Sequence, residues 1–171
     1  GLLMRSFLAL RAVDPGYDTR DVFTFQFAPE QAALKDGPSW ARFHLTFLDR
    51  LAALPGVTSA GIVENVPLDE GTRNDRFRSE DMPEGPDSGP PLNWTFAGGD
   101  YFRTMKIDVL DGRPFETADH LSVHGNVIIS RSAAKLLFPG QSAVGRRLQQ
   151  QGQKDWHTVV ALVGRIAELQ A

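Results

Sequence analysis

The feature that most constrains the fold of this chain is a strand signal that runs directly into a helix signal near the C-terminal end. Residues 126–130, Asn-Val-Ile-Ile-Ser, form a short apolar run of the kind found in buried strands. Ser130 is placed to cap a helix over residues 131–138, and Pro139-Gly140 ends that helix. A strand, a capped helix and then the Gly-Arg-Arg-Leu start of another strand predict a mixed α/β domain.

The first third of the chain predicts the order helix, strand, helix, strand. Residues 1–13 carry apolar side chains at helical spacing, and residues 22–27 alternate so that three phenylalanines point to one face of a half-buried strand. The strongest helix signal covers residues 39–54, and residues 57–66 predict a second strand. Residues 22–66 therefore predict a βαβ-like unit, in which parallel and split pairing both remain open.

The middle of the chain is polar and rich in turn residues. We expect residues 67–91 to form a long loop, interrupted only by a short strand at residues 76–78. Residues 92–97 alternate as a strand does, and Asp100 is placed to cap a short helix. Residues 156–163 are apolar on both faces, which predicts a central or well-covered strand.

Composition argues against several classes of function. The net charge of −3 and the scattered basic residues are unlike a nucleic-acid-binding surface. The absence of cysteine excludes disulfides and thiolate metal sites. The sequence holds neither a G-x-S-x-G nucleophile elbow nor a phosphate-binding P-loop. No stretch approaches the roughly 20 apolar residues of a membrane-spanning helix, yet the start Gly-Leu-Leu-Met-Arg-Ser-Phe looks like a cut just beyond one.

The four histidines are the first candidates for acid–base or metal chemistry. His120 and His124 are spaced by four residues beside Asp119, which would supply a set of metal ligands if the segment were helical. The segment lies between turn signals and lacks the H-E-x-x-H pattern, so a solvated loop is the favoured interpretation. We expect His44 to be packed or half-exposed on its helix, and His157 to face solvent or a neighbouring strand.

The carboxylates of the polar middle segment are the second candidates. A hydrolase would need two of them to converge, and a hydrolytic role for Asp75 and Glu80 is one hypothesis. A solvated loop explains the whole set more simply, since loops concentrate such residues. We therefore predict no catalytic, cofactor-binding or metal-binding residue, no cofactor and no enzymatic activity. The set consists of Asp69, Glu70, Asp75, Glu80, Asp81, Glu84 and Asp87.

Several motifs in a fixed order are similar to those of MacB-like periplasmic core domains, which belong to ABC-transporter permeases of the MacB/FtsX type. The resemblance spans nearly the whole chain, and the ordered set is specific although each motif alone is weak. It rests on the run from 126 to 148 and on the segments Asp14-Pro-Gly-Tyr-Asp18, Val22-Phe-Thr-Phe25, Leu48 to Val57, Tyr101-Phe-Arg103, Leu110-Asp-Gly-Arg-Pro-Phe115 and Trp156-His-Thr-Val-Val160.

The resemblance implies an α+β fold in which a mixed α/β subdomain called Sabre is inserted into a porter-like βαβ subdomain. Residues 1–13 would continue from a transmembrane helix. Residues 14–66 and 156–171 would form the porter-like subdomain, and residues 67–155 the Sabre-like insertion. A second strand-helix-strand follows in the family, so the porter-like part would be incomplete at its C-terminal side and would keep an unpaired strand edge.

The resemblance also implies a function. The domain would lie on the periplasmic side of the inner membrane and would relay ATP-driven conformational change for export or mechanotransmission. A separate cytoplasmic ATP-binding subunit or domain would act through the transmembrane helices, with a periplasmic adaptor or a second permease copy as further partners. The alternative is a stand-alone periplasmic module that binds a peptide or an adaptor, which would expose an apolar patch or groove.

Overall fold

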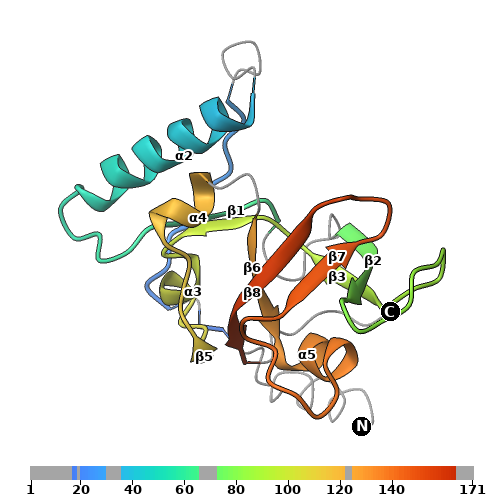
Figure 1. Cartoon of the computed structure of the whole chain (residues 1–171). Coiled ribbons are helices and arrows are strands. Elements are labelled where there is room, and N and C mark those ends of the chain that lie inside the picture. The colour runs from blue at the N-terminus through green and yellow to red at the C-terminus, as the bar shows by residue number, and fades with distance from the viewer. Residues whose placement is uncertain (1–16, 19, 30–35, 66–72, 122–124, 165–171) are drawn as a thin grey trace, which may run out of the picture.

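The computed structural model describes residues 17–18, 20–29, 36–65, 73–121 and 125–164 (Figure 1). The described residues form a six-stranded sheet, a two-stranded sheet and four helices. The long helix α2 (Gly37–Ala52) lies at one side of the molecule, whereas α5 (Arg131–Leu137) lies at the far end of the large sheet. The mixed α/β fold class predicted from the sequence is therefore confirmed.

The six-stranded sheet has the order β3-β2-β7-β8-β5, and β6 pairs with β8 along the edge that β7 and β5 leave free. The pairing of β6 with β8 is parallel, and the other pairings are antiparallel. The bounds are β2 Arg73–Ser79, β3 Pro91–Trp94, β5 Val109–Gly112, β6 Asn126–Ser130, β7 Arg147–Gln150 and β8 Trp156–Val163.

β8 is the centre of this sheet because it pairs with three other strands. Val159 and Ala161 are fully buried on one of its faces, as the apolar pattern of residues 156–163 predicts. The helix predicted after β6 is also confirmed, since the Ser130 hydroxyl accepts a hydrogen bond from the Ala133 N–H at 3.2 Å. The core around Val159 further contains Phe77, Ile129, Leu137, Phe138, Ala143 and Leu148.

The smaller sheet consists of β1 (Gly61–Val63) paired antiparallel with β4 (Ala97–Gly99). The short helix α3 (Tyr101–Thr104) follows β4 and approaches β1 closely. A Cβ on Gly61 would lie 2.4 Å from the Tyr101 Cα, so only glycine fits at that position of β1. A second core joins this small sheet to the large one, because Tyr101 and Phe102 are buried together with Val163 of β8.

α2 confirms the helix predicted over residues 39–54. Asp36 accepts a hydrogen bond from the Ser39 N–H at 2.7 Å, and Pro38 occupies the first turn, so the helix has a complete N-terminal cap. Of the side chains of α2, only Leu48 is buried. The apolar stripe of this helix is thus only partly covered by the described residues.

The strand predicted over residues 22–27 is not part of either sheet. No strand pairing joins this segment to the described residues, and it contacts α2 through aromatic rings instead. The rings of Phe23, Phe25 and Phe27 still follow one another at 5.9 and 6.2 Å, as alternating side chains of a strand-like backbone do. The alternation therefore predicted correctly that the three rings share one face of the segment. Strand pairing also requires a neighbouring backbone, and alternation alone does not indicate one.

Other predicted boundaries also need correction. The strand expected over residues 57–66 is limited to β1, and the strand expected over 92–97 is divided between β3 and β4, which belong to different sheets. The loop predicted over 67–91 contains the whole of β2, because Phe77 and Ser79 are buried in the large sheet. Of the loop expected at 119–125, residues 119–121 are helical and belong to α4 (Thr117–Leu121).

The predicted division into porter-like and Sabre-like parts stays a prediction. β8, which this division places in the porter-like part, is paired with β5, β6 and β7 of the predicted insertion. The helix predicted over residues 1–13 lies outside the described residues. In the part of the chain that the structure describes, no helix has the length and apolar character needed to cross a membrane.

Candidate functional site

α4 occupies the place where α2, the small sheet and the large sheet approach one another (Figure 1). Asp119 is the centre of this junction, with a side chain only 5% exposed. Its carboxylate accepts two hydrogen bonds from the Arg113 guanidinium, at 2.6 and 3.0 Å, and one from the Glu116 N–H at 2.7 Å. The Asn126 side-chain amide of β6 donates a further bond. We call Arg113, Asp119, His120 and Asn126 the α4 junction.

The electrostatics of the junction follow from these contacts. The hydrogen bonds from Arg113 hold the pKa of the Asp119 carboxyl well below its ordinary value, although burial opposes that shift. The same bonds raise the pKa of the Arg113 guanidinium. Asp119 is therefore ionised near neutral pH, and its carboxylate connects the segment after β5 to the start of β6.

His120 connects the junction to the small sheet. Its Nε2 atom accepts a hydrogen bond from the Gly99 N–H of β4 at 3.3 Å, and its ring lies 5.9 Å from that of Phe115. Burial lowers the pKa of His120, while the nearby Asp119 charge acts in the opposite direction. Burial also lowers the pKa of His44 on α2, and the proximity of His120 adds to that effect. Both imidazoles are therefore favoured in the neutral form.

The structure does not bring the proposed metal ligands together. Asp119 is engaged by Arg113 and Asn126, His120 accepts from Gly99, and His124 lies outside the described residues. Across the described residues no group of three His, Cys, Asp or Glu side chains could hold a metal ion. His157 bonds through Nδ1 to the Gly125 carbonyl at 3.1 Å, so it faces the chain entering β6, as predicted for a residue beside a neighbouring strand.

The carboxylates proposed for a hydrolase are separated and individually engaged. Asp75 lies in β2 and accepts hydrogen bonds from the Trp94 indole at 2.7 Å and the Gln150 amide at 3.0 Å. The loop interpretation of Asp75 is thus wrong, since the side chain links three strands. Glu80 pairs with Arg147 at 2.8 Å. Asp81 and Glu84 pair with Arg146 and Arg78, and Asp69 and Glu70 lie outside the described residues.

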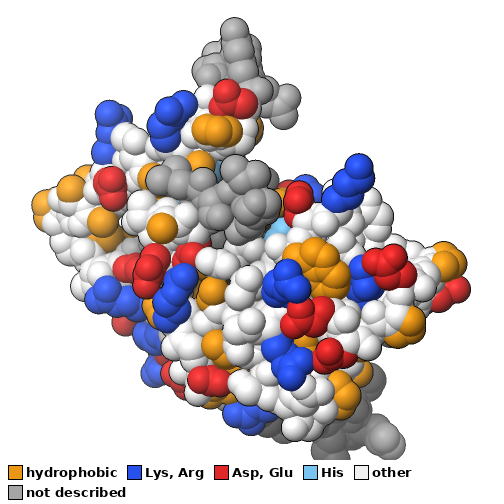
Figure 2. Space-filling view, in the orientation of Figure 1, with side chains coloured by type: hydrophobic (Ala, Val, Ile, Leu, Met, Phe, Trp, Pro, Cys, Tyr) orange, Lys and Arg blue, Asp and Glu red, His pale blue; other side chains and the backbone are white. Residues whose placement is uncertain are grey.

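These ion pairs explain the character of one face of the large sheet. Lys and Arg side chains alternate there with Asp and Glu side chains and form no band of one sign (Figure 2). Two cations lie over the Trp156 ring, with its centroid 4.8 Å from the Arg78 guanidinium and 5.5 Å from that of Arg147. Arg146 and Arg147, which look like an isolated basic pair in the sequence, are therefore each paired with a carboxylate across the sheet.

The mixed α/β fold agrees with a comparison of the whole sequence with known families. The profile of the family described as the MacB-like periplasmic core domain matches residues 9–169. The chain belongs to this family. It is accordingly the extracytoplasmic domain of a MacB-like ABC-transporter permease, a kind of domain that is not catalytic. No curated protein matches the sequence.

Solved structures of two such domains are similar to this MacB-like domain. The extracellular domain of the noncanonic ABC-type transporter YknZ from Gram-positive bacteria is 24% identical, with a TM-score of 0.44 over 68% of this chain and 54% of that one. The periplasmic region of MacB from Actinobacillus actinomycetemcomitans is 18% identical, with a TM-score of 0.44 over 71% of this chain and 51% of that one. The chain thus spans about half the length of these structures.

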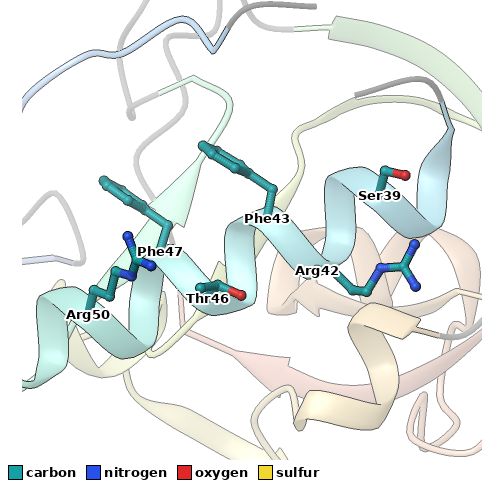
Figure 3. Close-up of a pocket in the computed structure, with 6 residues that line it drawn as sticks. All are labelled: Ser39, Arg42, Phe43, Thr46, Phe47 and Arg50. Carbon is teal, nitrogen blue, oxygen red and sulfur yellow. The ribbon is translucent and has the colours of Figure 1, made fainter. Parts of the chain in front are cut away.

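Sequence reasoning missed one feature of this MacB-like domain, which is an open aromatic surface. Phe23 is 86% exposed and Phe25 is 52% exposed. Beside them, one side of α2 lines a shallow groove of about 410 Å³ (Figure 3). Phe43 and Phe47 project from the same side of the helix, with Arg50 next to Phe47. The alternation of residues 22–27 signalled an apolar face, but no local signal states whether such a face is covered.

Proposed function

We propose that this domain relays ATP-driven conformational change in a permease of the inner membrane, for export or mechanotransmission. A separate cytoplasmic ATP-binding subunit or domain hydrolyses ATP, and the transmembrane helices of the permease carry the movement to the periplasmic side. The domain itself makes and breaks no covalent bond. A periplasmic adaptor or a second permease copy receives the movement.

The observation that carries this proposal is that two differently packed parts meet at the α4 junction. The large sheet has its own core around Val159, whereas α2 contributes only Leu48 to the buried residues. Asp119 bonds toward the large sheet and His120 bonds toward β4. A part that is held by few buried contacts can shift while a rigid neighbour keeps its shape, as hinge and shear movements require.

The connection from α2 to β1 supports the proposal further. It runs over residues 53–60 and turns at Gly56, whose φ of +85° suits glycine and leaves open space around it. At its end the Ser59 hydroxyl bonds to the Thr104 hydroxyl of α3 at 3.0 Å. This side-chain bond and the hydrogen bond from the Asp100 N–H to the Ala60 carbonyl at 2.9 Å hold the end of the connection to the body of the domain.

We also propose the division into a porter-like part and a Sabre-like insertion, with the first part formed by residues 14–66 together with the chain from residue 156 onward. The support for it is the family, together with the separation of α2 and β1 from the large sheet. Because β8 pairs with three strands of the insertion, movement of the porter-like part would reach the large sheet through β8 and α4.

A reversible disulfide cross-link tests the proposal. The chain has no cysteine, so in a permease from which any other cysteine has been removed the double substitution Ser59→Cys and Thr104→Cys introduces a single pair where the two hydroxyls are 3.0 Å apart. We expect the oxidised permease to hydrolyse ATP but to lose its ability to complement cells that lack the gene. A reductant should restore complementation.

The two single-cysteine variants are the matched controls, since they carry the same changes without a bond. They should complement with and without oxidant. Full complementation by the oxidised double variant, with the disulfide verified by mass spectrometry, would contradict a relay that needs movement at this connection.

A further inference from the structure

We propose that Lys106 holds the segment around Asp18 against the end of α3 through a strained contact that opens and closes as the domain relays movement. The role of this contact rests on the proposed relay function. Both sides of the contact are described residues, so its two partners are known. We call Asp18, Arg20, Asp21 and Lys106 the α3 latch.

The backbone of the α3 latch is strained on both sides of the contact. Among the described residues, Asp21 and Lys106 are the two non-glycine residues with a positive φ, of 63° and 53°. Residues other than glycine rarely adopt this conformation, which aspartate tolerates better than lysine. The two residues meet because the carbonyl of Arg20, next to Asp21 in the chain, accepts a hydrogen bond from Lys106 Nζ at 3.4 Å. Strained conformations gather at switch regions and persist only where surrounding contacts hold them.

Lys106 occupies a helix-terminal position at which glycine is common. The Lys106 N–H donates to the Arg103 carbonyl at 3.1 Å, and the Ile107 N–H donates to the Phe102 carbonyl at 2.8 Å. These two bonds form the Schellman motif that ends many helices, and its left-handed residue is usually glycine because glycine has no Cβ. Lysine is less favourable than glycine in this backbone conformation, so its contribution to the fold comes from its side chain.

The Lys106 side chain joins α3 to the segment around Asp18. Its Nζ atom donates to Asp18 Oδ2 at 3.2 Å, and the Asp18 N–H donates to the Met105 carbonyl at 2.9 Å. Arg20 donates to the same carboxylate from Nη2 at 2.7 Å. The side-chain hydrogen bonds from Arg20 hold the pKa of the Asp18 carboxyl well below its ordinary value. Asp18 is therefore ionised near neutral pH, and its contact with Lys106 is a charge pair.

The contacts that keep the α3 latch closed are weak enough to open without unfolding the rest of the domain. The Lys106 side chain is half-exposed, so solvent screens the charge pair and its net contribution is small. Tyr17 and Val22, on either side of the segment, are only partly buried against the core around Tyr101. A strained turn that is held by such contacts has the low opening free energy that a moving element needs.

Hydrogen exchange in the membrane-embedded permease tests whether the latch opens. The reporter is the Asp18 amide, which donates to Met105 and is resolved from its neighbours by fragmentation in the mass spectrometer. We expect its exchange to accelerate at least about tenfold when ATP is added. The Val159 amide, in the closed core of the large sheet, should keep its rate. An unchanged rate at Asp18 during continuing ATP hydrolysis would overturn the proposal.

Substitutions of Lys106 separate a latch from an ordinary turn. Lys106→Gly relieves the strain and removes the charge pair, so the unfolding temperature should be unchanged or higher while Asp18 exchanges fast with and without ATP. Lys106→Arg keeps a cation and should retain slow exchange without ATP. The matched control is Arg103→Ala, which removes another exposed cation of α3, paired with Asp100 at 3.4 Å, and should behave as the wild type. Wild-type exchange at Asp18 in Lys106→Gly would overturn the proposal.

Complementation of cells that lack the gene distinguishes failure of the latch from failure of the relay. We expect the Lys106→Gly permease to hydrolyse ATP but to complement poorly, and Arg103→Ala to complement fully. If Lys106→Gly complements fully while the oxidised Ser59→Cys, Thr104→Cys variant does not, the relay stands and the latch is overturned. If the oxidised variant also complements fully, the relay fails and the latch fails with it.

Discussion

The large sheet and the layer formed by α2 with residues 22–28 are both rich in apolar side chains, yet they are packed in different ways. In the core of the large sheet Val159 and Ala161 have no exposed surface, and Leu137 of α5, which packs there, is 2% exposed. In the α2 layer Leu48 is the only buried side chain of the helix, and Phe23 and Phe25 are largely exposed. Apolar side chains thus form a closed core in one region and remain partly exposed in the other.

This difference indicates which region contributes most to the stability of the fold. Burying an apolar side chain completely stabilises the fold by about 1.5–3 kcal/mol, and partial burial contributes less. The large sheet therefore unfolds only with the whole domain, while the α2 layer opens at a lower free energy. The region that holds the domain together is not the region that carries the exposed aromatic side chains.

The largest expected effect comes from a truncation in the closed core. Leu137→Ala should lower the free energy of unfolding by about 2–5 kcal/mol, because the side chain is 2% exposed and leaves a cavity. Leu136→Ala, on the same helix at 55% exposure, should change it by less than about 0.5 kcal/mol. Urea unfolding measures both, and similar losses would show that α5 does not close the core as described.

The next largest effect tests a close approach in the large sheet. Gly112 in β5 has a φ of +81°, and a Cβ there would lie 2.1 Å from the Val160 carbonyl oxygen. Gly112→Ala should lower the free energy of unfolding by about 2–3 kcal/mol, because the backbone conformation is strained for alanine and the added Cβ collides with that oxygen. Gly140→Ala, at φ +73° in open space, should cost only about 1 kcal/mol from the backbone conformation. Thermal unfolding that gives equal losses would contradict the close approach of β5 to β8.

Asp119→Asn tests the junction between the two regions. The substitution should lower the free energy of unfolding by about 1–2 kcal/mol near pH 7. The loss is modest because Arg113 is partly exposed and its charge is screened by solvent. The folded-state pKa of Asp119 lies below the ordinary 3.8, so its stabilisation is present above about pH 4 and is lost as the pH falls. The variant should therefore show a flatter acid dependence in denaturant titrations. Asp100→Asn, at an exposed 3.4 Å pair with Arg103, is the control and should behave as the wild type.

The smallest expected effect is an acid-sensitive loosening of the α2 layer. The pKa of His120 is lowered in the folded state, so the contact with Gly99 is fully stable above the ordinary 6.5 and weakens as the pH falls below that value. His44 on α2 and Asp119 on α4 are the titratable neighbours that influence it. Hydrogen exchange corrected for pH should accelerate at Gly99 and in α2 between about pH 7.5 and 5.5.

His120→Gln removes the titration at this position while keeping a hydrogen-bond acceptor. In this variant, amide hydrogen exchange at Gly99, once corrected for the intrinsic rate, should be the same between about pH 7.5 and 5.5. If the wild type and the variant respond alike, His120 is not the group that controls the contact.

The parts of the fold that could be predicted from the sequence are those that local signals determine. Ser130 and the Pro139-Gly140 turn delimit α5, and the cap at Asp36 and Ser39 precedes the apolar pattern of α2, so both helices were predicted correctly. The pattern of residues 156–163 indicated a strand covered on both faces because its composition records burial directly.

What could not be predicted depends on contacts between distant segments. Residues 22–27 alternate like a strand, but pairing needs a neighbour that the segment itself does not specify. Asp75 looks like a loop residue until β3 and β7 supply Trp94 and Gln150 as its partners. The α4 junction likewise assembles from side chains whose polar character alone gives no sign of burial.

The central claim, that the α2 layer moves relative to the large sheet when the permease uses ATP, is tested most directly by a distance measurement. Ala52→Cys at the end of α2 and Gln153→Cys at the β7–β8 turn provide two exposed sites for spin labels, in a permease from which any cysteine outside this cysteine-free chain has been removed. In the membrane-embedded permease, pulsed electron paramagnetic resonance should show a shift of the distance distribution when ATP is added. An unchanged distribution during continuing ATP hydrolysis would contradict the account.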